Sequence, residues 1–203
     1  MHPRLQRYIE RALAHTEGIP EERKGLLEEV AAFVSSRREA GEVPALTFIC
    51  THNSRRSQMG QLWAAAAAAH FGVDRVRTFS AGTEVTAFHQ GARAAMERAG
   101  FVIEHADGGN PRYQVSYAKG GPVVECFSKT YDDPANPTEG IAAIMTCSEA
   151  DLACPAVSGA ELRVSLPYDD PKNADGTPNE ETAYDARCLQ IATEMLYLFS
   201  RIS

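Results

Sequence analysis

A cysteine and an arginine at the two ends of one short polar loop are the residues of this chain best suited to chemistry. Cys50 ends an apolar run, and Arg56 lies six positions later, where an alanine-rich segment begins. A strand, a polar loop and a helix N-terminus direct backbone N–H groups at one point, which favours a bound tetrahedral anion. The same field and a nearby guanidinium favour the thiolate form of cysteine, which is the nucleophile. Residues 44–59 therefore predict an oxyanion site with a reactive sulfur.

The residues between the sulfur and the helix are expected to line this anion loop. They are Thr51, His52, Asn53, Ser54, Arg55, Arg56 and Ser57. Arg56 can present a planar fork to two anion oxygens, which a lysine could not do. The alternative interpretation makes Cys50 an inert residue at a strand end and Arg56 a solvated charge. The strand-loop-helix setting favours the functional interpretation, because that is the context the motif requires.

Two further cysteines follow a second apolar run. Cys147 ends that run, and residues 148–154 can form a helical turn, capped by Ser148, that carries Cys154. Both cysteines could instead be small buried hydrophobic residues. A zinc site is disfavoured, because a lone cysteine pair lacks the further Cys or His ligands that zinc requires. We predict no metal.

A pair of aspartates offers an acid. Asp169 and Asp170 precede Pro171, and the proline favours an extended conformation at Asp170. When a thiolate attacks the central atom of an oxyanion, a positioned carboxylic acid can protonate the departing oxygen, at a gain of ~10² to 10⁴ in rate. Taken alone, however, this dipeptide is better explained by an ordinary Asp-Pro turn.

Strands that alternate with helices predict an α/β fold, a doubly wound four-stranded parallel sheet. The predicted strands are 45–49, 75–79, 141–146 and 162–166, and the predicted helices are 57–71, 90–99 and 182–202. Ligands of such sheets bind at the carboxyl ends of the strands. We therefore expect Cys50, Cys147 and Asp170 to face one edge of the sheet.

Two regions fall outside this alternation. Helical spacing over residues 4–16 and 21–40 predicts a helical N-terminal extension, residues 1–42, ahead of a main domain of residues 43–203. A stretch rich in glycine and proline at about 105–137 predicts an insertion, either a loop or a β-hairpin. The sequence assigns no role to either region.

Charge and composition limit the partners. The 203 residues carry a formal net charge of -7, which argues against nucleic acid or an anionic membrane as the main partner. No apolar run approaches the ~18 residues of a membrane span, and the first residues lack the pattern of a signal peptide. The five cysteines fit reduced thiols better than a secreted disulfide framework. We expect a cytoplasmic protein.

The loop sequence CTHNSRRS resembles the phosphate-binding loop of the low-molecular-weight tyrosine phosphatase and arsenate reductase superfamily. Its signature positions fall on Cys50, Asn53, Arg56 and Ser57. The segment TCSEADLACP, residues 146–155, resembles the redox segment of thioredoxin-coupled arsenate reductases, which ordinary low-molecular-weight tyrosine phosphatases lack. The chain is thus more similar to the reductase branch. The resemblance covers roughly residues 44–104 and 139–200.

This resemblance implies an arsenate reductase that binds no cofactor and takes electrons from a thioredoxin-type reductant. Cys50 would attack arsenate held by the loop and Arg56, and an Asp would protonate the leaving oxygen. Both branches of the superfamily carry this acid as the Asp of an Asp-Pro pair near the C-terminus, so the resemblance implies Asp170, with Asp169 the weaker candidate. Cys147 and Cys154 would then complete a disulfide relay that thioredoxin reduces.

Three positions depart from the family pattern. Arg55 adds a charge beside the loop, and His52 replaces a glycine that is usual there. Gln61 stands where reductases that bind a structural potassium ion carry an acid, so that ion is not predicted. Two alternatives stay open: a tyrosine phosphatase that hydrolyses aryl phosphates through a Cys50 phosphoenzyme, and a non-catalytic anion-binding regulatory protein.

Overall fold

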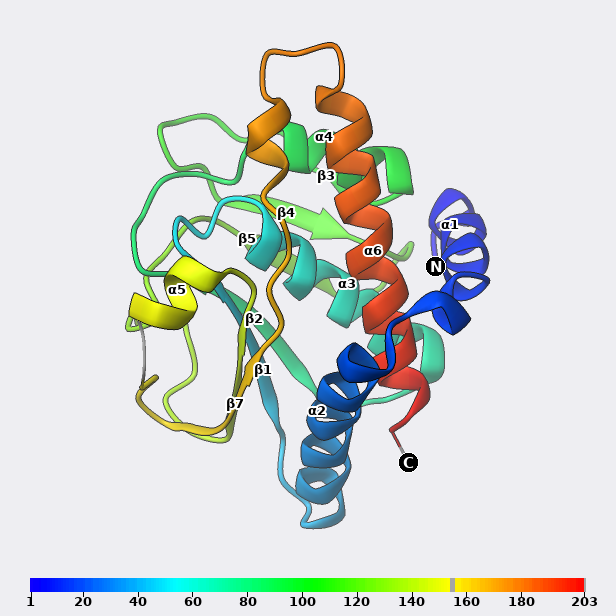
Figure 1. The fold of residues 1–203 in the computed structure, drawn as a ribbon, viewed down its shortest axis with the longest axis vertical. Coiled ribbons are helices and arrows are strands. Elements are labelled where there is room, and N and C mark those ends of the chain that lie inside the picture. Colours follow the sequence, from blue (N-terminus) through cyan, green and yellow to red (C-terminus); the bar gives the residue numbers. More distant parts are fainter. Residues whose placement is uncertain (154–155, 203) are drawn as a thin grey trace.

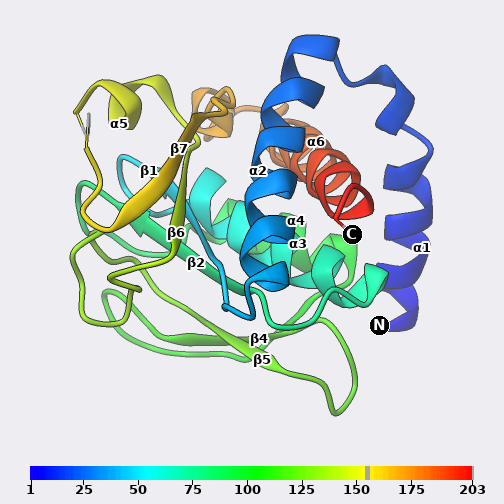
Figure 2. The same cartoon turned by 90° about the horizontal axis from the view of Figure 1, so that it is seen from below.

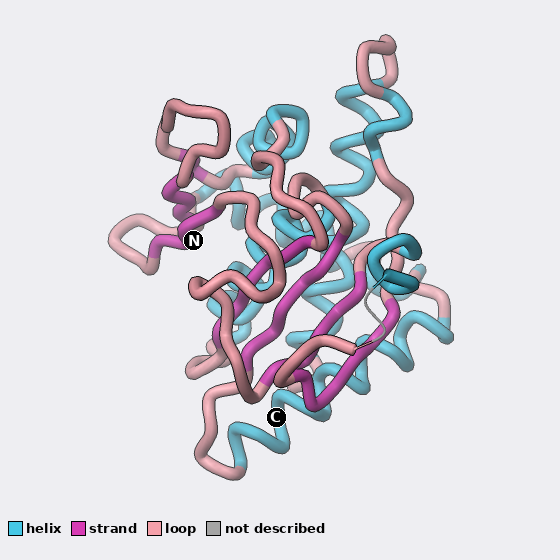
Figure 3. Tube along the Cα trace, turned by 90° about the vertical axis from the view of Figure 1, so that its left-hand side faces the viewer, coloured by secondary structure: helices cyan, strands magenta, loops and turns pink. Residues whose placement is uncertain are grey.

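A four-stranded parallel sheet forms the centre of the computed structural model, which describes residues 1–153 and 156–202 (Figure 1). The strand order is β2-β1-β6-β7, and every neighbouring pair is parallel. The strands are β1 (Ala45–Cys50), β2 (Arg77–Gly82), β6 (Ile141–Met145) and β7 (Ala160–Ser165). The four strands lie side by side in Figure 3. The predicted fold class is confirmed, and the predicted strand boundaries lie within three residues of those observed.

Helices cover both faces of the sheet, as Figure 2 shows. On one face lie α3 (Arg56–Phe71) and α6 (Glu180–Ser200), and the short α5 (Ser148–Ala153) lies on the other. All six residues of β1 are buried, which explains its uninterrupted apolar sequence. A Cβ atom at Gly60 would lie only 2.6 Å from the Phe48 ring, so this glycine lets α3 pack closely on β1.

The N-terminal segment forms helices that share the main core. They are α1 (Pro3–Leu13), a 3₁₀ turn (Thr16–Gly18) and α2 (Glu21–Glu39). Leu5, Ile9 and Leu27 are fully buried in one cluster with residues of α3 and α6. This confirms that helices precede the sheet, whereas the division into residues 1–42 and 43–203 stays a prediction.

The insertion contains a β-hairpin, the second of the two conformations that its sequence allows. Strands β4 (Tyr113–Ser116) and β5 (Val123–Cys126) pair antiparallel, and β3 (Val102–Ile103) pairs with β4. After β5 the chain returns to the main sheet, where Thr130 forms an isolated parallel bridge with Gly82 at the end of β2. The hairpin therefore belongs to a separate small sheet, and the segment that follows it pairs with the end of the edge strand β2.

Among the described residues, no helix combines the length and the apolar character needed to cross a bilayer. The same part of the chain holds no group of three or more His, Cys, Asp or Glu side chains placed to bind a metal ion.

Replacing Gly100 by Ala should destabilise the fold by loosening the contact between α1 and α4 (Gln90–Ala99). Gly100 ends α4 with φ +114, and its Cβ atom would lie 2.4 Å from the backbone nitrogen of Leu5. Gly72 ends α3 with φ +68 and has nothing within 4 Å, so Gly72→Ala is the matched control. Both substitutions carry the left-handed penalty, about 1–2 kcal/mol. In urea denaturation Gly100→Ala should lose roughly 1–3 kcal/mol more, because only it creates a clash. Equal losses would contradict this account of how the extension docks.

Candidate active site

The loop between β1 and α3 has a set of backbone donors without acceptors. Cys50 is the last residue of β1 and Arg56 the first of α3. Within residues 1–153 and 156–202, no group accepts a hydrogen bond from the backbone N–H of residues 52–55. Asn53 takes a left-handed conformation with φ 45, which asparagine tolerates better than most residues and which helps the chain turn back on itself. Buried donors without partners cost free energy, so the loop is suited to an anion.

Side chains of the loop hold the sulfur in place. Cys50 is 3% exposed, and its Sγ lies 3.1 Å from Oγ of Ser57. Asn53 Nδ2 donates to the same Oγ at 2.8 Å. Because Ser57 Oγ accepts from Asn53, its own hydrogen is free to donate to Sγ. The contact thus places a hydroxyl donor on the Cys50 sulfur.

The Arg56 guanidinium is buried beside the loop. Its Nη1 donates to the carbonyl oxygen of Tyr168 at 2.9 Å, and its Nη2 donates to Oδ2 of Asp170 at 2.7 Å. Its Nε is buried and has no hydrogen-bond partner among the described residues. An oxyanion bound in the loop could accept this hydrogen as well as those of the backbone.

Of the two candidate acids, only Asp170 contacts the loop residues. The Asp170 carboxylate pairs with Arg56, and its side chain is only 10% exposed. Its Oδ1 accepts from the backbone N–H of Lys172 at 3.0 Å. The Asp169 side chain is 96% exposed and pairs with Arg187 at 3.2 Å. The geometry thus favours Asp170 as the group that could exchange a proton with a bound anion.

Cys147 lies against the first residue of the loop. Its Sγ is 3.5 Å from Oγ1 of Thr51, and its side chain is fully buried. Cys50 and Cys147 belong to one small apolar cluster, on the sheet face that α5 covers. The predicted convergence at the carboxyl edge therefore holds for Cys50, Cys147 and Asp170. Cys154 lies outside the described residues.

Three other predicted loop residues direct their side chains at protein groups. His52 Nε2 lies 3.6 Å from the Glu84 carboxylate, and Ser54 Oγ donates to the Ala87 carbonyl at 2.6 Å. Arg55 Nε donates to the Tyr184 hydroxyl at 2.9 Å, and its Nη2 donates to Asp175 at 3.3 Å. These three residues would contact an anion through their backbone N–H groups, not their side chains.

Residues of the insertion form hydrogen bonds with the loop, and sequence patterns did not predict these contacts. Gln58 donates to the carbonyl of Phe127 at 2.9 Å. Ser128 Oγ donates to the His52 carbonyl at 2.9 Å, and the Lys129 backbone N–H donates to Asn53 Oδ1 at 2.9 Å. No local motif marks residues 127–129 for this role, because the contacts depend on where the hairpin returns to the sheet.

A family model and a curated relative match the part of the chain that contains this loop. Residues 45–111 match the model of a family described as low molecular weight phosphotyrosine protein phosphatase. A curated relative, an arsenate reductase of Bacillus licheniformis, is 30% identical over 142 residues, which cover 69% of this chain and 83% of the relative.

Solved structures show the same fold at lower identity. A low-molecular-weight phosphotyrosine phosphatase of Vibrio cholerae is 12% identical with a TM-score of 0.53, over 77% of this chain and 95% of that one. An arsenate reductase in its phosphate-binding state is 19% identical with a TM-score of 0.52, over 79% of this chain and 99% of that one.

Alkylation of the native protein should distinguish the loop cysteine from the core cysteines. Burial raises the pKa of Cys126 to about 12 and that of Cys188 to about 11, so both should resist iodoacetamide near pH 6. Cys50 should react, and inorganic phosphate or arsenate should protect it. Peptide mass spectrometry assigns the modified residue, and Cys50→Ser is the control. Labelling of Cys126 or Cys188 without Cys50, or labelling of Cys50 that phosphate leaves unchanged, would contradict the assignment.

Proposed function

The chain belongs to the superfamily of low-molecular-weight phosphotyrosine phosphatases and arsenate reductases, and we propose that within it this protein is an arsenate reductase. Membership indicates an enzyme of the phosphatase or reductase type, so a non-catalytic role is not retained. The observation that carries the proposal is the second buried thiol, Cys147, whose Sγ lies 3.5 Å from Thr51 Oγ1 in the anion loop.

In the first step the loop binds arsenate through its free backbone N–H groups and the unpaired Nε of Arg56. The Cys50 thiolate attacks arsenic, so that an S–As bond forms and an As–O bond breaks. Asp170 supplies the proton with which the departing oxygen leaves as water. Arsenic is still As(V) in this covalent adduct.

In the second step Cys147, as its thiolate, attacks Sγ of Cys50. An S–S bond forms, the S–As bond breaks, and its electron pair stays on arsenic, which leaves as arsenite. The two sulfurs are oxidised and As(V) is reduced to As(III). The shared apolar cluster keeps both sulfurs away from water before this exchange.

In the third step Cys154 attacks Cys147 and releases the Cys50 thiolate, which leaves a Cys147–Cys154 disulfide for a thioredoxin-type reductant to reduce. The helix between these cysteines is tied to β7. Ser165 Oγ donates to the Asp151 carboxylate at 2.8 Å, and the Arg163 guanidinium donates to the Asp151 carbonyl at 2.7 Å. Transfer of the disulfide outward would require these bonds to loosen.

The second candidate is a phosphatase. Cys50, Arg56 and Asp170 suffice for a phosphoenzyme mechanism, and the family model that matches residues 45–111 is named for phosphatases. In that case Cys147 and Cys154 would be dispensable. Aryl phosphate hydrolysis that is unchanged in a Cys147→Ala/Cys154→Ala variant, with no arsenate reduction by the wild type, would favour it.

The N-terminal extension would support the acid in either mechanism. Arg23 of α2 donates to both carboxylate oxygens of Glu194 at 2.8 and 2.7 Å, and to the Pro167 carbonyl at 3.1 Å. The Tyr168 hydroxyl donates to the same Glu194 carboxylate at 2.7 Å. Pro167 and Tyr168 lead directly into Asp170. We therefore propose that α2 positions the acid-bearing loop.

The Cys154→Ser variant tests the relay. It should release about one arsenite per enzyme molecule, because the Cys50–Cys147 disulfide still forms, and then stop even with thioredoxin present. Rapid-quench measurement of arsenite gives the burst, and non-reducing peptide mapping identifies the disulfide. Wild-type enzyme is the control. Sustained turnover of Cys154→Ser would rule out the relay.

The Arg23→Lys variant tests the support of the acid loop. Lysine keeps the charge beside Glu194, but its ammonium group lacks the planar fork that reaches both Glu194 oxygens and the Pro167 carbonyl. A lost hydrogen bond costs about 0.5–1.5 kcal/mol, or about 1.5–3 kcal/mol when the acceptor is charged. Turnover should therefore fall roughly two- to tenfold, whereas the inhibition constant of inorganic phosphate should stay unchanged. Lys24→Gln, which removes a neighbouring ion pair with Glu21 on the surface of the same helix, is the matched control. Parallel losses of turnover and phosphate affinity would contradict a role confined to the acid.

A further inference from the structure

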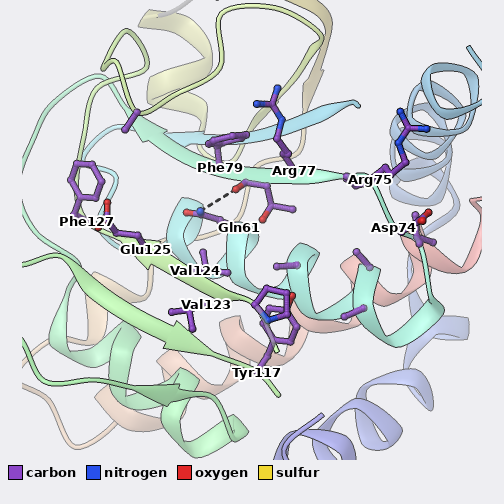
Figure 4. Close-up of a pocket in the computed structure, with 18 of the residues that line it drawn as sticks. Gln61, Asp74, Arg75, Arg77, Phe79, Tyr117, Val123, Val124, Glu125 and Phe127 are labelled. Carbon is purple, nitrogen blue, oxygen red and sulfur yellow. Dashed lines mark hydrogen bonds between the residues drawn. The ribbon is translucent and has the colours of Figure 1, made fainter. Parts of the chain in front are cut away.

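A pocket away from the anion loop opens between the edge strand β2 and the hairpin strand β5 (Figure 4). Its volume is about 600 Å³, within the range of sites for small organic ligands. Alanines 65, 68 and 69 of α3 line it, together with Phe79, Val124 and Phe127. The large pocket is therefore mainly apolar and exists because the hairpin stands off from β2.

One buried cation lines this pocket without a counter-ion. Lys129 is 3% exposed, and no carboxylate of the described residues lies within 4.0 Å of its ammonium group. Its Nζ lies 4.7 Å from the centre of the Phe127 ring. Burial lowers the pKa of Lys129, as expected for an ammonium group with too little solvation. A buried charge of this kind is stabilised by an anion that enters the pocket.

A second buried polar group in the pocket is incompletely bonded. Gln61 is 4% exposed, and its Nε2 donates to the Thr78 carbonyl at 3.1 Å. Its Oε1 has no hydrogen-bond partner among the described residues. The Lys129 ammonium and the Gln61 carbonyl oxygen are thus two polar groups of an otherwise apolar cavity that are available to a ligand among the described residues. A few fixed polar groups of this kind orient a largely apolar molecule.

The rim carries charges of both signs. Arg75 and Arg77 are matched there by Asp74 and Glu125. Arg75 donates to the Gly41 carbonyl, and the Arg77 guanidinium lies 5.5 Å from the Phe79 ring centre. The rim therefore adds no net charge, and the single interior cation favours a ligand with one negative charge.

We propose that this pocket binds a small organic monoanion with a flat apolar body, its carboxylate on the Lys129 ammonium and its body on the alanine face of α3. The site is separate from the anion loop and is built by the insertion. Lys129 contacts the anion loop only through its backbone N–H, and its side chain lines the pocket.

Calorimetric titration with 2-naphthoate tests the site, and neutral 2-naphthamide is the matched ligand. The full-length protein, with excess inorganic phosphate present to occupy the anion loop, should bind one 2-naphthoate at least about tenfold more tightly than 2-naphthamide, since a hydrogen bond to a charged group is worth about 1.5–3 kcal/mol. Lys129→Met should remove this preference. Lys119→Met, which neutralises an exposed lysine elsewhere in the insertion, should keep it.

A second variant keeps the test decisive if Lys129→Met folds poorly. Ala65→Leu fills the floor of the pocket without changing Lys129, and it should weaken binding of both ligands at least about tenfold, because the flat body no longer fits. Absence of saturable 2-naphthoate binding, equal affinities for the two ligands, or binding that survives Ala65→Leu would each overturn the proposal. None of these results bears on arsenate reduction, which is assayed separately.

Discussion

The candidate site depends on a set of hydrogen-bond donors that find no acceptor among the described residues and that lie in the short loop after Cys50. The backbone N–H groups of residues 52–55 and the Nε of Arg56 have no acceptor among the described residues. A folded protein seldom leaves such groups unsatisfied. The free-energy cost of such donors is offset when a ligand accepts their hydrogen bonds, and an oxyanion is suited to accept several of them at once. Cys50 begins the same loop, so the proposed anion binding and the proposed nucleophilic attack would depend on one set of donors.

Much of the remaining chain keeps these donors in place. The parallel sheet brings the ends of β1 and β6 together, so that Cys50 and Cys147 lie in one buried cluster although they are far apart in the sequence. The insertion forms hydrogen bonds with the loop and the start of α3 through Phe127, Ser128 and Lys129. The N-terminal extension reaches the loop that carries Asp170 through Arg23 and Glu194. The two added segments thus contact different parts of the candidate site: the insertion contacts the anion loop, and the extension contacts the residues that lead into Asp170.

The sequence predicted the parts of this arrangement that follow from local pattern and topology. Apolar runs located the four strands, and the rule for the carboxyl edge brought Cys50, Cys147 and Asp170 together. Sequence patterns could not predict that the Arg55 side chain binds Tyr184 and Asp175, because these contacts join residues more than a hundred positions apart. The resemblance favoured Asp170 over Asp169 as the acid, but only the coordinates show that the Asp170 carboxylate contacts Arg56 while the Asp169 side chain is exposed. The brace by residues 127–129 and the unpaired Lys129 ammonium are likewise tertiary properties with no local motif.

The most direct test of the account is steady-state arsenite production by the wild-type protein with thioredoxin, thioredoxin reductase and NADPH, beside hydrolysis of an aryl phosphate under the same conditions. We predict many arsenite molecules per enzyme, competitive inhibition by inorganic phosphate, and aryl phosphate hydrolysis that is slow by comparison. Rapid aryl phosphate hydrolysis without arsenite would contradict the claim that the second sulfur beside the anion loop serves to pass electrons.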